Sequence, residues 1–127
     1  MAIREQERAK FALERVNEAK TLNIRDKYKT QLIKLPARLQ MNGLGQTVAF
    51  YLSEGTGSPE VKICEWLQDW LRPDHSRIYP ANKSLIEAIT QGTPDEYRRA
   101  SAEVRALVVW LKRFAEAFIE DIAEARR

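Results

Sequence analysis

The chain has 127 residues, of which 44% are hydrophobic and 31% charged, and its net charge is +3. This length predicts a single domain, residues 1–127, whose apolar core can fold without a disulfide or a structural metal. The only cysteine, Cys64, leaves no intramolecular disulfide and favours a reducing cytoplasm. The N-terminus mixes acids with bases, so we expect no signal or transit peptide. No segment approaches the roughly 20 apolar residues of a membrane span, so we expect no membrane partner.

The first part of the chain shows helical periodicity and no alternating strand pattern. Residues 3–20 predict a helix whose apolar face consists of Ala9, Ala12, Leu13, Val16 and Ala19. Residues 26–41 predict a second helix, with one face made of Tyr28, Leu32, Leu35 and Leu39. Pro36 lies within this second stripe and lacks the backbone donor of a helix interior. We therefore expect a kink or a fresh helix start at Pro36.

Two glycines follow in the segment NGLGQ, residues 42–46. A dinucleotide-binding loop needs a third glycine and a preceding strand. A Walker loop needs a second glycine five residues on, followed by Lys-Ser or Lys-Thr. This segment has neither pattern. We therefore favour a helix junction over a phosphate loop. We expect Gly43 to end a helix in the left-handed conformation, and Gly45 to allow a close helix approach at the start of the next element.

The middle of the chain predicts three further helices. The first has one apolar face made of Leu44, Val48, Tyr51 and Leu52. Ser58 and Pro59 are typical of the cap and first turn of a helix, and they predict the start of the second of these helices. Its apolar stripe consists of Val61, Cys64, Leu67 and Leu71. Trp66 and Trp70 lie beside that stripe, and we favour the edge of the core for them over an exposed pair at a protein interface. An irregular stretch then leads to a short helix that ends at Gly92.

The C-terminal segment predicts the longest helix. Thr93 and Glu96 have the spacing of a capping box, and Pro94 suits the first helical turn. The apolar stripe that follows consists of Tyr97, Val104, Leu107, Leu111, Phe114, Phe118 and Ile122. In total we predict an all-α fold: about six helices in a compact single-domain bundle with a long C-terminal helix, and no sheet.

Few residues are suited to catalysis or metal binding. His75, the only histidine, is adjacent in the chain to Asp74 and Ser76, and three adjacent loop residues cannot converge as a catalytic triad. We expect His75 to be a solvated loop residue. Cys64 falls on an apolar stripe, which favours a buried, inert thiol. One histidine and one cysteine fall short of a tetrahedral metal site. We therefore predict no enzyme activity, no cofactor and no metal, with a small enzyme as the remote alternative.

Positive charge is concentrated in the first part of the chain. Residues 1–50 carry 10 Lys and Arg against 5 Asp and Glu, whereas residues 51–127 carry 11 against 13. Lys27, Lys34 and Arg38 are spaced at seven and four residues, so they share one helical flank if the helix bends little. Lys112 and Arg113 point away from the apolar stripe of the last helix. A phosphate backbone is one partner that fits these residues, and an ordinary solvated surface is the alternative.

Two segments carry a family resemblance, KLPARLQMNGLGQTVAFYLSEG and YRRASAEVRALVVWLKRFAEA. Their NGLGQTVAF and WLKRFAEA blocks together resemble the small helical subunit of the type III-B CRISPR effector, the Cmr complex. The resemblance spans most of the chain and implies a small, α-helical, non-catalytic protein. As partners it implies the backbone and large subunits of the complex, further copies of the chain, the guide CRISPR RNA and the target RNA. Such subunits help to stabilise the assembly and line the channel of the guide–target duplex.

Our leading hypothesis is therefore a subunit of an RNA-guided antiviral complex. The resemblance assigns no residue to RNA, so the basic side chains give the candidate RNA contacts: Lys27, Lys34, Lys112, Arg38 and Arg113. Such contacts would be to phosphates and independent of base sequence, since the protein must serve any guide. The alternative hypothesis is a protein–protein interaction scaffold of the same complex that makes no direct RNA contact.

Overall fold

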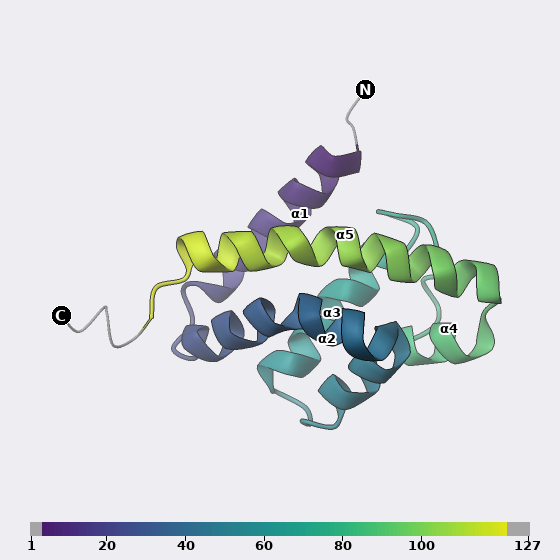
Figure 1. The fold of residues 1–127 in the computed structure, drawn as a ribbon, viewed down its shortest axis with the longest axis horizontal. Coiled ribbons are helices and arrows are strands. Elements are labelled where there is room, and N and C mark those ends of the chain that lie inside the picture. Colours follow the sequence, from purple (N-terminus) through teal and green to yellow (C-terminus); the bar gives the residue numbers. More distant parts are fainter. Residues whose placement is uncertain (1–3, 122–127) are drawn as a thin grey trace. The chain divides into compact units, whose positions relative to one another are not determined.

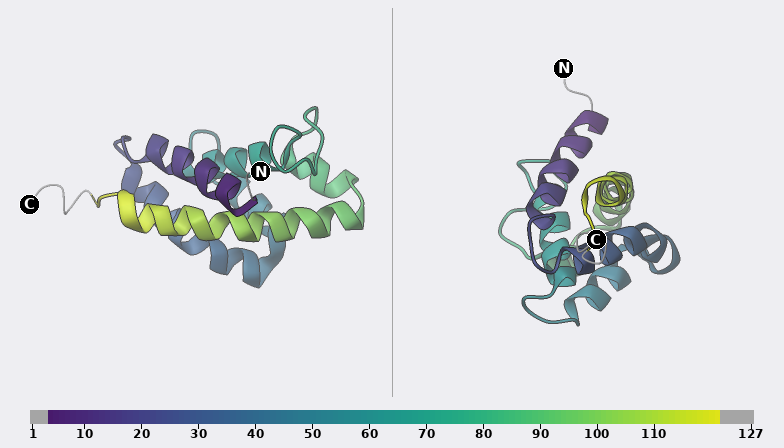
Figure 2. Two further views of the ribbon diagram at one scale, coloured as in Figure 1. Left: turned by 90° about the horizontal axis from the view of Figure 1, so that it is seen from above. Right: turned by 90° about the vertical axis from the view of Figure 1, so that its left-hand side faces the viewer.

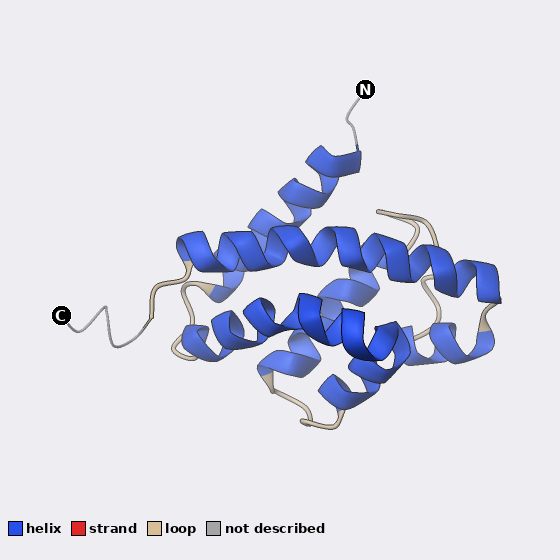
Figure 3. Ribbon diagram, viewed as in Figure 1, coloured by secondary structure: helices blue, strands red, loops and turns tan. Residues whose placement is uncertain are grey.

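The computed structural model describes residues 4–121, and all regular elements within them are helices (Figures 1 and 3). They are α1 (Arg4–Ala19), α2 (Arg25–Leu52), α3 (Pro59–Leu71), α4 (Leu85–Gln91) and α5 (Pro94–Phe118). The predicted all-α fold with a long C-terminal helix is confirmed. The predicted helix start at Ile3 and the predicted core residue Ile122 lie outside the described residues. Among the helices described, none has a stretch apolar and long enough to cross a membrane.

The described chain forms two compact units. The first, which we call the terminal unit, takes its residues from 1–37 and 106–127, and the second, the central unit, consists of residues 38–105. Helices α2 and α5 each contribute residues to both units. The single domain over residues 1–127 stays a prediction.

The difference between five helices and the predicted six lies in α2. Gly43, inside this element, has φ 82° and ψ 169°, so the backbone leaves the helical conformation at this residue. The predicted junction at Gly43 and its left-handed φ are confirmed, whereas ψ is extended and not that of a left-handed helical residue. This combination of φ and ψ is essentially restricted to glycine. The turn allows Leu39 before it and Leu44 after it to be buried together in the central unit.

Pro36 lies inside α2 and neither ends nor restarts the helix. A fresh start at this residue is wrong, because the interruption falls at Gly43 instead; the other alternative, a kink at Pro36, stays a prediction. The leucines of the stripe explain why the helix continues: Leu32 and Leu35 are 0% exposed and Leu39 is 1% exposed. Burying a leucine stabilises a fold by about 1.5–3 kcal/mol, so three of them outweigh the roughly 3 kcal/mol that a proline costs in a helix interior.

The terminal unit contains α1, the first part of α2 and the second part of α5. Its buried apolar residues are Phe11, Ala12, Val16, Ala19, Tyr28, Leu32, Leu35, Leu107, Val108, Leu111, Ala115 and Ile119. Helix α1 and the second part of α5 lie side by side (Figure 2), and Trp110 Nε1 donates to Glu5 Oε2 at 3.2 Å. Arg25 Nε donates to the carbonyl of Glu120 at 3.0 Å. These bonds attach both ends of the second part of α5 to the other helices of the unit.

Phe118 is a predicted core residue that the structure places at the surface, where it is 50% exposed. Its ring continues a row that starts at Trp110 and Phe114, with neighbouring ring centroids 5.5 and 5.9 Å apart. The buried positions at this end of the helix are Ala115 and Ile119 instead. The prediction was wrong in the direction of the face: after Leu111 the buried positions recur every four residues, at Ala115 and Ile119, whereas the predicted stripe stepped by three to Phe114 and so to Phe118.

The central unit contains the second part of α2, α3, α4 and the first part of α5. Its buried apolar residues include Leu39, Leu44, Val48, Tyr51, Ile63, Cys64, Trp66, Leu67, Trp70, Leu71, Tyr79, Leu85, Ala88, Ala100 and Val104. Trp66 and Trp70 are 3% and 1% exposed, so they belong to the core and not to an exposed interface. Trp70 Nε1 also donates to Glu103 Oε1 at 3.0 Å, which links α3 to α5.

Side chains at the helix starts bind the free backbone N–H groups as the sequence predicts. The Ser58 hydroxyl accepts a hydrogen bond from the first turn of α3 at 3.1 Å. At α5, Thr93 Oγ1 accepts from the Glu96 N–H at 3.1 Å, and Glu96 Oε1 accepts from the Thr93 N–H at 2.8 Å. A second capping box, between Ser84 and Glu87 at α4, was not predicted. Local chemistry therefore fixes where three of the helices begin.

Candidate nucleic-acid interface

The two units differ in charge. Over the full sequence the terminal unit has 13 Lys and Arg against 9 Asp and Glu, whereas the central unit has 8 against 9. Because RNA is a polyanion, the terminal unit is electrostatically the better partner for it. Four of the five predicted RNA-binding residues, Lys27, Lys34, Lys112 and Arg113, belong to the terminal unit, and Arg38 is the first residue of the central unit.

The basic side chains at the start of α2 divide into two groups. Arg25 holds the carbonyl of Glu120, and Lys29 Nζ lies 3.4 Å from Asp121 Oδ1, with 18% of its side chain exposed. Lys27 and Lys34 are exposed, and neither forms an ion pair with another described residue. Seven residues are almost two helical turns, so these two lysines lie on the same flank of α2. They therefore present two positive charges along one line, neither of them paired within residues 4–121.

Arg38 is held by the central unit itself. Its Nη1 donates to the Tyr51 hydroxyl at 3.0 Å, and its guanidinium lies 5.4 Å from the ring centroids of both Phe50 and Tyr51. The carbonyl of Arg38 accepts from Thr47 Oγ1 at 3.2 Å. Burial raises the pKa of Tyr51, and the hydrogen bond from Arg38 opposes that effect. Arg38 therefore links the segments of α2 before and after Gly43, a structural role that the sequence did not reveal.

Gly45 contributes its backbone to the same junction. The N–H groups at the start of a helical segment have no partner within that segment, and the Gly45 N–H donates to the Tyr97 hydroxyl at 3.0 Å. A Cβ atom at Gly45 would lie 3.5 Å from the Tyr97 hydroxyl and 3.6 Å from Ile89 Cγ2. Gly45 therefore lies against residues of α4 and α5, with room for a methyl group but not for a long side chain.

Lys112 and Arg113 lie on the second part of α5. Arg113 is exposed and Lys112 is half-buried, and neither forms an ion pair with another described residue. Adjacent helical residues point about 100° apart around the axis. The two side chains therefore do not form one compact patch, and the exposed Arg113 is the better placed of them for contact with a partner.

Arg77 is an exposed basic residue that the sequence interpretation missed. It is the one non-glycine residue with a positive φ, 61°, in the described part of the chain. Its N–H donates to the carbonyl of Arg72 at 3.0 Å, and the N–H of Ile78 donates to the carbonyl of Leu71 at 3.0 Å. These bonds fold the loop back onto the end of α3. No sequence signal marks the position, because a left-handed non-glycine residue is imposed by the surrounding turn.

The structure also shows the surroundings of the residues that were considered for catalysis. The ring of His75 stacks on Trp70 with centroids 5.5 Å apart, so His75 is half-buried and not fully solvated as predicted. Ser76 Oγ donates to the carbonyl of Trp70 at 2.6 Å. The histidine and the serine thus both contact the tryptophan, an arrangement that serves packing of the loop.

Cys64 is 4% exposed in α3. Burial, followed by the charges of Glu60 and Glu65, raises the pKa of its thiol to about 12. The predicted burial is confirmed, and a thiol with so high a pKa is expected to be neutral near pH 7, so the predicted inertness stays a prediction. Within residues 4–121, no three His, Cys, Asp or Glu side chains gather into a group that could hold a metal ion.

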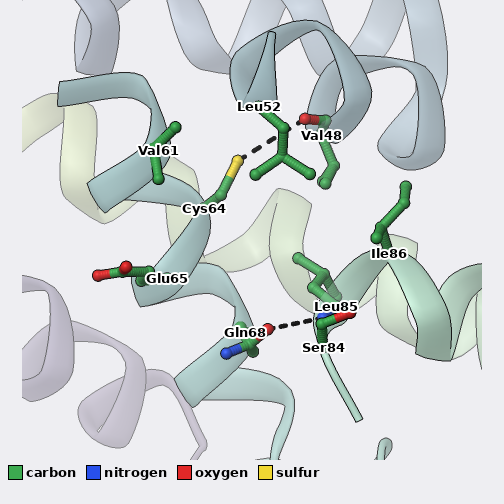
Figure 4. Close-up of a pocket in the computed structure, with 9 residues that line it drawn as sticks. All are labelled: Val48, Leu52, Val61, Cys64, Glu65, Gln68, Ser84, Leu85 and Ile86. Atoms are coloured by element: carbon green, nitrogen blue, oxygen red, sulfur yellow. Dashed lines mark hydrogen bonds between the residues drawn. The ribbon is translucent and has the colours of Figure 1, made fainter. Parts of the chain in front are cut away.

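A groove of about 210 Å³ lies in the central unit between the end of α2, α3 and the start of α4 (Figure 4). It is lined by Val48, Leu52, Val61, Cys64, Glu65, Gln68, Ser84, Leu85 and Ile86. Cys64 Sγ lies 3.9 Å from the carbonyl of Val48. Gln68 Oε1 accepts from the N–H of Leu85 at 2.6 Å. These contacts hold α3 against both neighbouring helices, so the groove is bordered by elements fixed to one another.

Comparison with known proteins finds consistent matches. Residues 4–118, from the start of α1 to the end of α5, match a family model described as CRISPR-associated protein (Cas_Cmr5). A curated relative, the CRISPR system Cmr subunit Cmr5 of Thermus thermophilus, is 32% identical over 123 residues, which cover 95% of this chain and 100% of the relative. The crystal structure of a CRISPR-associated Cmr5 family protein from the same organism has a TM-score of 0.79 at 33% identity, and the match covers 94% of this chain and 100% of that one.

Proposed function

Because the chain belongs to the Cmr5 family of CRISPR-associated proteins, we propose that it helps to assemble a cytoplasmic Cmr ribonucleoprotein complex and contacts the RNA held there. In this role it is a non-catalytic small subunit of RNA-guided antiviral defence. It binds the backbone and large subunits and further copies of itself. It also lines part of the channel that contains the guide CRISPR RNA paired with its target RNA.

The observation that supports the RNA contact is the pair Lys27 and Lys34. Both side chains are exposed, both lack an ion-pair partner among the described residues, and they share one flank of α2. They belong to the unit with the excess of positive charge. Each lysine that neutralises a phosphate releases condensed counterions, so the contact strengthens as the salt concentration falls.

Contact with phosphate groups suits the proposed role because it does not depend on the identity of the bases. Phosphate contacts fix the position of a nucleic acid, whereas base contacts carry sequence specificity. In RNA-guided complexes the guide supplies specificity through base pairing, and the protein recognises the shape and backbone of the duplex. Two lysines in line along a helix therefore provide what such a subunit needs.

The non-catalytic part of the proposal is supported by the reactive side chains. The neutral, buried thiol of Cys64 is a poor nucleophile. His75 is stacked against Trp70. Both residues take part in the packing of the central unit.

Charge reversal tests the RNA contact. Lys27→Glu and Lys34→Glu, singly and together, are incorporated into the reconstituted Cmr complex, and RNA retention is measured over a series of salt concentrations. Each lost contact is expected to reduce the slope of log affinity against log salt by about 0.7–0.9. Arg105→Glu, at an exposed position of the central unit, is the matched control and should leave the slope unchanged.

The scaffold hypothesis makes the opposite forecast for the same experiment. If the double variant assembles normally and retains RNA with the affinity and salt dependence of the wild type, the lysines are solvated surface residues. The chain would then act through protein contacts alone. Arg38 is left out of this test because its substitution would also disturb Tyr51 and Phe50.

A further inference from the structure

The basic side chains near the start of α2 project from opposite faces of the helix. An α-helix turns by about 100° per residue, so Arg25 and Lys29, four residues apart, share one face. Lys27 lies about 180° from the middle of that face, and Lys34 lies about 160° from it. The face with Arg25 and Lys29 is directed towards the residues after α5, and the opposite face carries the two exposed lysines of the proposed RNA contact.

The first of these faces attaches the start of α2 to Glu120 and Asp121, which belong to the same terminal unit. Arg25 Nε donates to the carbonyl of Glu120 at 3.0 Å, and Lys29 Nζ lies 3.4 Å from Asp121 Oδ1. The side chain of Lys29 is 18% exposed and that of Asp121 is 48% exposed. Partial burial reduces the solvent and salt screening that weakens ion pairs on the open surface. The pair of Lys29 and Asp121 is therefore suited to hold the helix start in place.

The start of α2 is a part of the fold where such an attachment matters. Its first turn contains Arg25 and Lys27, with Asp26 as the acid, and Lys29 follows in the next turn. The positive end of a helix dipole disfavours cations in the first turn. A lysine in a frayed first turn would lose conformational freedom when it bound a phosphate, and this loss would weaken binding. An attachment on the opposite face reduces that loss in advance.

We propose that Lys29, through its ion pair with Asp121, is a positioning residue for the RNA contact. The pair fixes the first turns of α2 so that Lys27 is presented to a phosphate, and Lys29 itself does not touch the RNA. The inference rests on the RNA contact proposed above and extends it to residues on the opposite face of the helix. Asp121 thereby strengthens the binding of a polyanion, although its charge alone would repel phosphate.

The sign of the effect at Asp121 provides the first test. Asp121→Asn removes the ion pair together with one negative charge, and RNA affinity is measured at fixed salt in the reconstituted Cmr complex. We expect RNA binding about threefold weaker than that of the wild type, the size of effect that the loss of such a pair produces. Glu116→Gln, at an exposed position of α5 in the same unit, is the matched control. It removes an equal charge and should leave the affinity unchanged or slightly higher.

A charge swap separates positioning from direct contact. Lys29→Asp breaks the pair and should weaken RNA binding. Lys29→Asp/Asp121→Lys restores a pair with the charges exchanged, while the net charge and the combined length of the two side chains stay those of the wild type. If Lys29 acts through the pair, the double variant should recover RNA affinity to within about twofold of the wild type. A residue that binds phosphate directly would not be rescued by a change at its partner.

Photo-crosslinking to the bound RNA gives the local measurement. In the Asp121→Asn protein, the crosslink yield from a photoreactive residue at position 27 should fall at least about threefold. The yield from position 34, five residues after Lys29, should stay within about twofold of its wild-type value because local loosening affects the nearest turns most. Circular dichroism and thermal unfolding verify that each variant is folded. Equal losses at the two positions would contradict a local positioning role.

Two further results would overturn the proposal. The first is RNA binding by Asp121→Asn that equals or exceeds that of the wild type. The second is a charge-swap variant that binds RNA as weakly as Lys29→Asp. Failure of the RNA contact itself is recognised separately, because Lys27→Glu/Lys34→Glu would then retain RNA normally in the same assay. If the positioning role alone is wrong, that lysine double variant still loses RNA.

Discussion

At the scale of single residues, the junction inside α2 depends on a few side chains around Gly43. Arg38 reaches across it to Tyr51, and Thr47 Oγ1 donates to the Arg38 carbonyl. Beyond it, the Gly45 N–H donates to the hydroxyl of Tyr97. Because these bonds join residues before and after the turn, they fix the conformation that Gly43 allows. The turn is therefore a defined structural feature and not a random interruption of the helix.

Alanine substitutions at the two glycines separate backbone strain from packing. Gly43→Ala should lower the free energy of unfolding by about 1–3 kcal/mol, because φ 82° with ψ 169° is a region that L residues avoid. Gly45→Ala should keep or raise stability, since its Cβ would make ordinary contacts at 3.5 and 3.6 Å and alanine favours a helix over glycine by up to about 1 kcal/mol. Urea denaturation measures both values. Equal losses in the two variants would contradict the assigned role of Gly43.

The state of Cys64 is also testable at this scale. The pKa of its thiol is raised to about 12, so the thiolate fraction at pH 8 is very small. We expect alkylation by iodoacetamide at pH 8 to be at least about a thousandfold slower in the folded protein than in an unstructured peptide, whose cysteine has a pKa of about 8.5. Mass spectrometry follows the reaction. A rate equal to that of the peptide would show an accessible, ionised thiol.

At the scale of helices, the starts were easier to predict than the interiors. Ser58, Thr93 and Glu96 act where the sequence places them, because a cap depends on residues within one turn of each other. Pro36 and Phe118 were misjudged because their outcome depends on distant residues. Burial of the leucines beside Pro36 keeps the helix continuous. Phe118 lies beside the buried face, which the packing of α5 directs through Ala115 and Ile119.

Alanine substitutions at two threonines compare a helix cap with an interior helical position. Thr93→Ala should lower the free energy of unfolding by about 1 kcal/mol, because it removes the acceptor of the Glu96 N–H at the start of α5. Thr30 lies in the interior of α2, where its hydroxyl donates to the carbonyl of Asp26 at 3.0 Å. Thr30→Ala should change stability little, because alanine is the better helix former. Thermal unfolding of both variants is the measurement, and a larger loss for Thr30→Ala would argue against the cap.

The capping box of α4 predicts a pH dependence. Hydrogen bonds from the backbone and side chain of Ser84 lower the pKa of the Glu87 carboxyl below its ordinary value of 4.5. A group of this kind stabilises the fold fully above its unfolded-state pKa, and the stabilisation is lost as the pH falls through its folded-state pKa. Glu87→Gln should therefore be less stable than the wild type at pH 7, and the difference should shrink below pH 4.5. Glu116→Gln controls for the loss of one exposed charge, and a difference independent of pH would refute the assignment.

At the scale of the whole molecule, the sequence predicted the helical class, the family and the basic character of the first half. The sequence could not show which basic residues remain available for contact with a partner. Arg25 and Lys29 are engaged with the residues after α5, and Arg38 with Tyr51, whereas Lys27 and Lys34 are unpaired among the described residues. The groove was also beyond prediction, because residues from three helices form it. Such features depend on tertiary packing, which spacing along the chain does not determine.

The central claim is that this chain contacts RNA through α2 of the terminal unit, and site-specific photo-crosslinking tests it most directly. A photoreactive amino acid is placed at position 27 or 34, with position 74 as the control, and the assembled Cmr complex is irradiated with its guide and target RNA bound. We predict crosslinks to RNA from positions 27 and 34 and none from position 74. Crosslinks from both lysine positions to protein alone would contradict the account and leave the chain as a protein scaffold.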